Sequence, residues 1–136
     1  MATPFTHKNL TEVKDSAPEF GLDEHGEARF AKDELDAEAT GFSYYRNKPD
    51  AHAGFGHRHD KAEEVYVILS GSGRMKLDDE IIEVKRLDTI RVAPDVWRAF
   101  SAGPDGLEVI AFGPRHDGDG EMDMQWWVEG NDESGG

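Results

Sequence analysis

Between residues 28 and 113 the chain is a succession of short strand-like segments separated by turn-forming residues. Each segment alternates apolar and polar residues or is rich in β-branched and aromatic ones, and Gly, Pro and Asp gather between them. The expected strands cover 28–31, 41–47, 64–70, 74–78, 80–84, 88–93, 97–101 and 107–113. Short strands at about ten-residue spacing are typical of a sandwich or small barrel, so the sequence predicts an all-β fold.

Two glycine-rich segments are expected to be the turns that reverse the chain. SGSG at 70–73 follows the strongest of the expected strands, so Gly71 is predicted to end that strand at a tight hairpin. AGPDG at 102–106 carries turn signals of the same kind between the last two expected strands.

The length of 136 residues and a hydrophobic content of 37% suit one domain with one core. We expect an N-terminal arm over 1–27 packing on the barrel, a barrel domain over 28–116, and an acidic tail over 117–136. Three apolar residues of the arm are expected to anchor it to the core: Phe5, Phe20 and Leu22. Trp126 and Trp127 are expected to hold the tail over the barrel mouth or against a partner subunit.

The formal net charge of −14 bears on the partners of the chain. An acidic surface repels phosphate backbones and anionic lipids, so we expect neither nucleic acid nor a membrane as a partner. No apolar run approaches the length that crosses a bilayer, and the N-terminal segment has no apolar stretch typical of a secretory signal. The chain has no cysteine, which excludes thiolate ligands and fits a reducing compartment. These features predict a cytoplasmic location.

The segment GFGHRHDKAEEVYVILSGSG at 54–73 holds the residues with the most specific chemistry. His57 and His59 are two residues apart, so on an extended strand both side chains lie on one face. Glu64 begins the next expected strand on the same face as Tyr66, and a short bend between the strands can return its carboxylate to both imidazoles. Two histidines and one carboxylate with open positions suit Fe(II), and also Mn, Ni or Zn.

The pattern H-x-H-x4-E-x6-G in this segment resembles the first motif of the cupin superfamily, and the strands from about 40 to 113 resemble its barrel. The resemblance implies a cupin-like jelly-roll β-barrel that holds a divalent metal ion through His57, His59 and Glu64. Glu63 is the alternative carboxylate if the loop is one residue shorter. The resemblance also implies a homodimer formed through barrel edges.

The chain departs further from the second motif of that family, because Arg98 in VAPDVWRAFSAG stands where a fourth ligand, a histidine, is expected. An arginine offers only donors and cannot bind a metal. In one alternative His57, His59 and Glu64 still bind the metal, and Arg98 holds an anionic group of the substrate. In a second alternative, Arg98 pairs with Glu64 and the pocket contains no metal. A third is that both histidines face solvent and form no site.

The pocket is expected inside the barrel, with Arg98, Tyr66 and Phe100 contacting the substrate. We therefore expect a small cupin that binds a divalent metal and a small, anionic molecule, with oxygenase or isomerase chemistry implied by the resemblance. The alternative is a metal-free module that binds a small molecule without turning it over. The sequence does not select between them or name the reaction.

Overall fold

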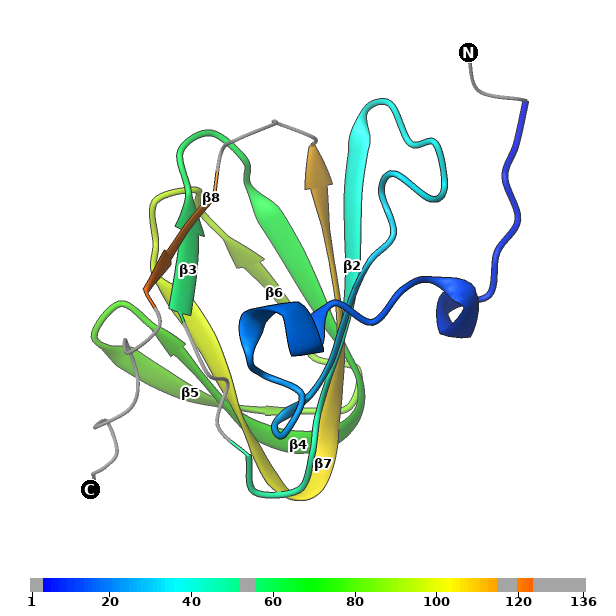
Figure 1. Ribbon diagram of the computed structural model, residues 1–136. Helices are drawn as coiled ribbons and strands as arrows, with labels where there is room; N and C mark the ends of the chain where they lie inside the picture. Colours follow the sequence, from blue (N-terminus) through cyan, green and yellow to red (C-terminus); the bar gives the residue numbers. More distant parts are fainter. Residues whose placement is uncertain (1–3, 52–55, 115–119, 124–136) are drawn as a thin grey trace.

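The computed structural model describes residues 4–51, 56–114 and 120–123, with only the backbone described for 121–123. Two short 3-10 helices, η1 (Leu10–Glu12) and η2 (Ala17–Phe20), precede the strands (Figure 1). The strands are β1 (Gly26–Phe30), β2 (Thr40–Asn47), β3 (Gly56–His59), β4 (Glu64–Leu77), β5 (Glu80–Lys85), β6 (Thr89–Val92), β7 (Arg98–Pro114) and β8 (Gly120–Asp123). The predicted all-β fold class is confirmed.

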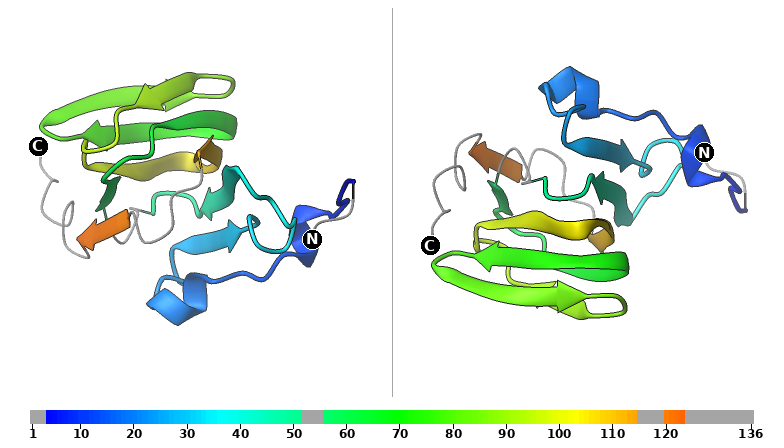
Figure 2. Two further views of the ribbon diagram at one scale, coloured as in Figure 1. Left: turned by 90° about the horizontal axis from the view of Figure 1, so that it is seen from above. Right: turned by 90° about the horizontal axis from the view of Figure 1, so that it is seen from below.

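The strands form two antiparallel sheets that share the long strands β4 and β7 (Figures 1 and 2). One sheet has the order β1-β2-β7-β4-β6, and it uses the first part of β4 and the last part of β7. The other has the order β8-β3-β7-β4-β5, and it uses the opposite parts of the two long strands. Because β4 and β7 pass from one sheet into the other, the sheets enclose the single interior of a jelly-roll barrel.

The two predicted glycine turns are wrong, because both segments lie inside continuous strands. Residues 70–73 are part of β4 and residues 102–106 are part of β7, where the pairing of the two strands shifts register. Gly71 has φ 79° and Gly106 has φ 78°. A positive φ serves a β-bulge as well as a turn, so the glycines bend the strands instead of reversing them.

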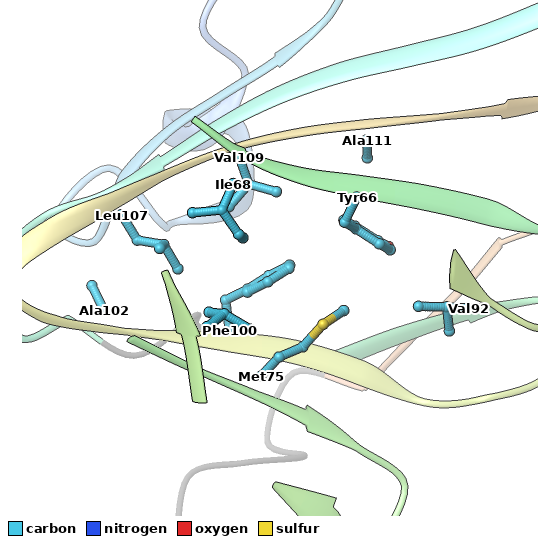
Figure 3. Close-up of a cluster of buried hydrophobic side chains, with 10 residues drawn as sticks. Tyr66, Ile68, Met75, Val92, Phe100, Ala102, Leu107, Val109 and Ala111 are labelled. Atoms are coloured by element: carbon cyan, nitrogen blue, oxygen red, sulfur yellow. The ribbon is translucent and has the colours of Figure 1, made fainter. Parts of the chain in front are cut away.

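The core fills the space between the inner faces of the two sheets (Figure 3). Tyr66 and Ile68 of β4 are fully buried, and Tyr66 packs edge-on against Phe100 of β7 with ring centroids 5.4 Å apart. The remaining buried residues of this cluster are Met75, Val84, Val92, Ala102, Leu107, Val109 and Ala111. Because alternate residues of a strand face the interior, the strand pattern in the sequence accounts for the inward side chains of Tyr66, Ile68, Met75 and Phe100.

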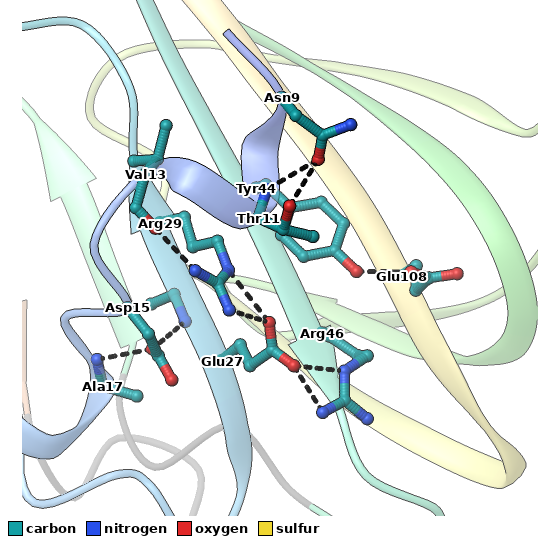
Figure 4. Close-up of polar contacts among 11 residues, drawn as sticks. Asn9, Thr11, Val13, Asp15, Ala17, Glu27, Arg29, Tyr44, Arg46 and Glu108 are labelled. Carbon is teal, nitrogen blue, oxygen red and sulfur yellow. Dashed lines mark hydrogen bonds and ion pairs between the residues drawn. The ribbon is translucent and has the colours of Figure 1, made fainter. Parts of the chain in front are cut away.

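The N-terminal arm is attached to the edge strand β1 by polar contacts (Figure 4). The carboxylate of Asp15 accepts hydrogen bonds from the backbone N–H groups of Ala17 and Ala28, each at 3.0 Å. Arg29 of β1 donates to the backbone carbonyl of Val13 in the arm. These contacts fix the arm against the first sheet and hold η2 beside β1.

The expectation that Phe5 anchors the arm to the core is wrong, because 79% of the Phe5 surface is exposed. Phe20 instead packs edge-on against Phe30, at a centroid distance of 6.3 Å. The expected acidic tail over 117–136, with Trp126 and Trp127, lies outside the described residues except for 120–123. Among the helices of the described ranges, none has the length and apolar character needed to span a bilayer.

Candidate functional site

Two neighbouring segments of the barrel bring the histidines and the glutamate together. In β3 His57 and His59 alternate with Arg58, so both imidazoles lie on the interior face. Glu64 is the first residue of β4, where its side chain shares that face with the buried Tyr66. The expected return of the chain between the two strands is therefore present.

Three potential ligand atoms of this cluster lie within 4.8 Å of one another. The Oε1 atom of Glu64 is 3.2 Å from Nε2 of His59 and 3.6 Å from Nε2 of His57. Glu63, the alternative carboxylate, points elsewhere and forms an exposed ion pair with Arg91 at 3.2 Å. The carboxylate that joins the two histidines is consequently that of Glu64.

Tyr66 and Arg98 both donate hydrogen bonds to Oε1 of Glu64. The distance from the Tyr66 hydroxyl is 2.6 Å, and the distance from Nη1 of Arg98 is 3.0 Å. The Tyr66 hydroxyl also lies 3.2 Å from Nε2 of His57. These two donors fix the orientation of the carboxylate toward the imidazoles, as outer-shell partners do in metal centres.

Arg98 itself is placed differently from the expected substrate anchor. It points inward, as expected, but its side chain is fully buried and does not line either cavity at the site. Its Nε donates to the carbonyl of Val96 at 2.8 Å, and its Nη2 donates to those of Ala93 and Pro94 at 2.6 and 3.2 Å. Because these contacts direct the guanidinium to the backbone and to Glu64, its role in the structure is to support the carboxylate.

The charge states of the cluster follow from burial and from these contacts. Burial alone would raise the pKa of Glu64, but the hydrogen bonds with His57, His59 and Tyr66 lower it well below its usual range. Burial lowers the pKa of His57, against the opposing influence of Glu64. Burial also raises the pKa of Tyr66 well above its ordinary value, so its phenol remains a donor. An ionised carboxylate beside a neutral imidazole is the protonation state that a metal ion requires.

The two separations from Glu64 to the imidazoles fit a divalent metal ion. Bonds of about 2.1 Å place adjacent ligands about 3.0 Å apart in an octahedron and about 3.4 Å apart in a tetrahedron. The 3.2 and 3.6 Å separations from Glu64 to the two imidazoles are close to those lengths. Nitrogen and carboxylate donors suit Fe, Mn, Ni and Zn alike, so the ligand set fits a metal without selecting one.

A cavity of about 430 Å³ opens beside the cluster. The elements β1, β2, β3 and the N-terminal arm supply most of its wall, which is largely apolar and aromatic. The wall includes Phe20, Leu22, Ala28, Phe30, Lys32, Asp33, Ser43, Tyr45, His57, His59 and Glu64. Sequence reasoning missed the contribution of the arm to this wall, because an irregular segment has no periodicity that shows which residues face inward.

The two aromatic residues expected to contact substrate do not line this cavity. Tyr66 and Phe100 line a smaller, separate space of about 60 Å³. Tyr45 and His57 line both spaces, so they form the boundary between them. A ligand in the larger cavity would therefore contact His57 and Tyr45 but not Tyr66 or Phe100.

Comparison with known protein sequences gives one short local match. No family model matches the chain. Over 38 residues the chain is 53% identical to an uncharacterized protein of Methanocaldococcus jannaschii, and this alignment spans 28% of the chain and 30% of that relative.

Similar solved structures share the whole barrel. A cupin protein from Bacteroides fragilis superposes with a TM-score of 0.68 at 24% identity, over 86% of this chain and 89% of that one. For oxalate decarboxylase from Bacillus subtilis the TM-score is 0.70 at 19% identity, over 90% of this chain and 35% of that enzyme. The polyketide cyclase RemF from Streptomyces resistomycificus gives 0.68 at 17% identity, over 89% and 84% of the two chains. The chain therefore has the jelly-roll fold of the cupin superfamily.

Proposed function

We propose that this protein binds a divalent metal ion through His57, His59 and Glu64 and admits a small molecule to the cavity beside it. The observation that carries the proposal is the convergence of three ligand atoms within 4.8 Å at the wall of a 430 Å³ cavity. A convergent set of polar groups in an otherwise apolar pocket is the usual form of a small-molecule site.

The protein residues would hold the metal and restrict access to it. Tyr66 and Arg98 orient Glu64 by donating to its Oε1 atom, while the largely apolar wall limits the water that reaches the cluster. A metal bound there would supply a Lewis acid with open positions, able to polarise an oxygen of the bound molecule. Oxygenase and isomerase chemistry are both compatible with this arrangement. Because solved structures of this fold include a decarboxylase and a cyclase, the fold does not select a reaction.

The contacts of Arg98 remove the reason to expect an anionic ligand. That preference depended on an Arg98 guanidinium facing the cavity, and the guanidinium is directed to Glu64 and to backbone carbonyls instead. Lys32 and Asp33 both contribute to the cavity wall, so the wall carries one charge of each sign there. We propose a small molecule without a required negative charge.

A second candidate function is a metal-free binding module. The ion pair between Arg98 and Glu64, with Nη1 and Oε1 3.0 Å apart, favours it because this pair already neutralises the buried carboxylate. The two histidines would then act as hydrogen-bond groups toward a ligand. Metal content separates the two candidates, and oxygen uptake or turnover then separates an enzyme from a binding module.

The first experiment is elemental analysis of protein purified without an affinity tag or chelator. We expect near-stoichiometric iron, manganese, nickel or zinc in the wild type and loss of that metal in His57→Ala and His59→Ala. His7→Ala is the matched control, because His7 is exposed in the arm. Metal retained by the His57 variant would refute the site. No metal in the wild type, and no uptake on anaerobic addition, would favour the module with the Arg98–Glu64 pair.

A further inference from the structure

Three aromatic rings in the wall of the larger cavity form a row of successive contacts. Phe20 of η2 packs against Phe30 of β1 with ring centroids 6.3 Å apart and planes at 82°. Phe30 in turn packs against Tyr45 of β2 at 6.1 Å and 80°. Tyr45 borders both cavities together with His57, so the row of rings ends beside the imidazole.

The outer two rings of this row remain open to contact. Phe20 and Phe30 are each 40% exposed although both line the cavity. Removing apolar surface from water is favourable roughly in proportion to the area buried. An apolar ligand that covers these two rings would therefore gain binding free energy. Successive edge-to-face packing turns each ring by nearly a right angle, which presents both faces and edges to a ligand.

The cavity wall has its ligand cluster at one place and its aromatic rings at another. His57, His59 and Glu64 lie together, whereas Phe20 and Phe30 form an apolar part of the wall, beside which Lys32 and Asp33 add one charge of each sign. A ligand that matches this distribution has an apolar body and oxygen atoms at one edge. A sugar or a small dicarboxylate would instead lose hydrogen bonds with water along the aromatic wall.

We propose that the cavity binds a planar aromatic compound with a hydroxyl or carbonyl oxygen at one edge. Its ring packs along Phe20, Phe30 and Tyr45, and its oxygen points to the cluster of His57, His59 and Glu64. The inference deepens the proposed function and rests on it for the metal at the polar end. The packing of the ring does not require the metal.

Calorimetric titration with two compounds of the same skeleton tests this proposal. The probes are 2-naphthol and its saturated analogue decahydro-2-naphthol, which keeps the hydroxyl and loses the aromatic ring. We expect the zinc-loaded wild-type protein to bind 2-naphthol about tenfold more tightly than the saturated compound. Equal affinities, or tighter binding of oxalate than of 2-naphthol, would overturn the proposal.

Matched variants locate the binding to the row of rings. Phe30→Ala should weaken binding of 2-naphthol by about tenfold, and Phe30→Leu should remove the preference for the aromatic probe while keeping most of the apolar volume. Phe112→Ala should change neither, because Phe112 has a similar exposure of 37% but does not line the cavity. If Phe30→Ala does not fold, Phe30→Leu decides, and an unchanged preference in it would contradict the proposal.

The same titration on protein treated with EDTA separates the two proposals. A preference for 2-naphthol that persists without metal supports the aromatic site, even if metal analysis contradicts the metal centre. Loss of the preference in the wild type under both conditions contradicts the aromatic site, whatever the metal analysis shows.

Discussion

Nη1 of Arg98 lies 3.0 Å from Oε1 of Glu64, and the Arg98 side chain is fully excluded from solvent. The pair joins the start of β7 to the start of β4, and its carboxylate oxygen is the one that contacts both imidazoles. Its burial makes the two charges dependent on each other, since a buried charge without a partner is costly.

Removing Arg98 alone should therefore destabilise the protein strongly. We expect Arg98→Met to lower the free energy of unfolding by about 3–5 kcal/mol, because Glu64 is left as a buried charge. The double variant with Glu64→Gln should recover much of that loss. Arg91→Met is the control, since the exposed pair with Glu63 is expected to contribute less than about 1 kcal/mol. Urea denaturation measures all four proteins, and a loss from Arg98→Met no larger than the control would contradict the buried pair.

Arg98→His places an imidazole at the position where a fourth ligand is expected from the resemblance. The Cα atoms of residues 98 and 57 are register partners between β7 and β3, so the new side chain starts opposite His57. We expect this variant to bind zinc more tightly than the wild type in titration calorimetry. Weaker binding by the folded variant would mean that residue 98 contributes only through Glu64.

Tyr66→Phe tests whether the hydroxyl orients the metal-binding carboxylate. The hydroxyl donates to Glu64 at 2.6 Å, and loss of an outer-shell partner typically lowers metal affinity about 10–100-fold. We expect a decrease in zinc affinity in that range, measured by competition with a chelator. Tyr44→Phe is matched to it, because that hydroxyl donates to Glu108 away from the cluster. Equal affinities of the two variants would argue against a role for Tyr66 in the site.

The ion pairs of Glu27 on the outer face predict an acid-dependent loss of stability (Figure 4). Burial raises the pKa of Glu27, but the contacts with Arg46 and Arg29 together lower it by more. The pKa of Glu27 is therefore below its usual value. A carboxylate whose folded pKa is lowered stabilises the protein above its unfolded pKa of about 4.3, and the contribution is lost as the pH falls toward the folded pKa.

Comparison with Glu27→Gln isolates this contribution from the other acidic groups. The difference in melting temperature between wild type and variant should be largest near pH 7 and should shrink as the pH falls below about 4. Thermal denaturation followed by circular dichroism at several pH values measures it. A difference that stays constant down to pH 3 would show that the effect is not one of charge.

Substitution of Gly71 tests the close approach of the two long strands. A Cβ atom there would lie 2.0 Å from the carbonyl oxygen of Gly106, and the residue has φ 79°. We expect Gly71→Ala to destabilise the protein by more than about 1 kcal/mol, because strain of the backbone adds to the clash. Gly41→Ala, whose Cβ would meet its nearest neighbour at 3.6 Å, should cost much less. Similar urea midpoints for the two variants would contradict the strain.

The histidine pair and Glu64 show what the sequence can predict about this site. Because His57 and His59 are two residues apart, their imidazoles lie on one face of the strand, and this alternation is a property of any strand. Local patterns of this kind need no knowledge of the tertiary structure. The sequence leaves the choice between Glu64 and Glu63 open, and the structure decides it, because Glu64 contacts both imidazoles while Glu63 pairs with Arg91.

Gly71 and Arg98 show where such prediction ends. A glycine with positive φ fits a hairpin and a bulge equally, and only pairing with β7 shows that the strand bends there and continues instead of reversing. Arg98 was expected to point inward and does so, but the carbonyls that hold it come from the loop before β7. The role of the arm in the cavity wall was missed for a similar reason, since Phe20 reaches Phe30 through tertiary packing.

The sharing of β4 and β7 by both sheets also determines how the molecule can come apart. Residues as distant in the sequence as Val65 and Phe112 are direct partners, and so are Leu77 and Arg98. Neither sheet can lose its central strands without opening the other, so the backbone amides of both sheets should exchange with deuterium in one cooperative event. Pairings over such separations also favour slow folding, on the scale of milliseconds to seconds. The protein thus gains a rigid frame around its cavity at the expense of folding speed.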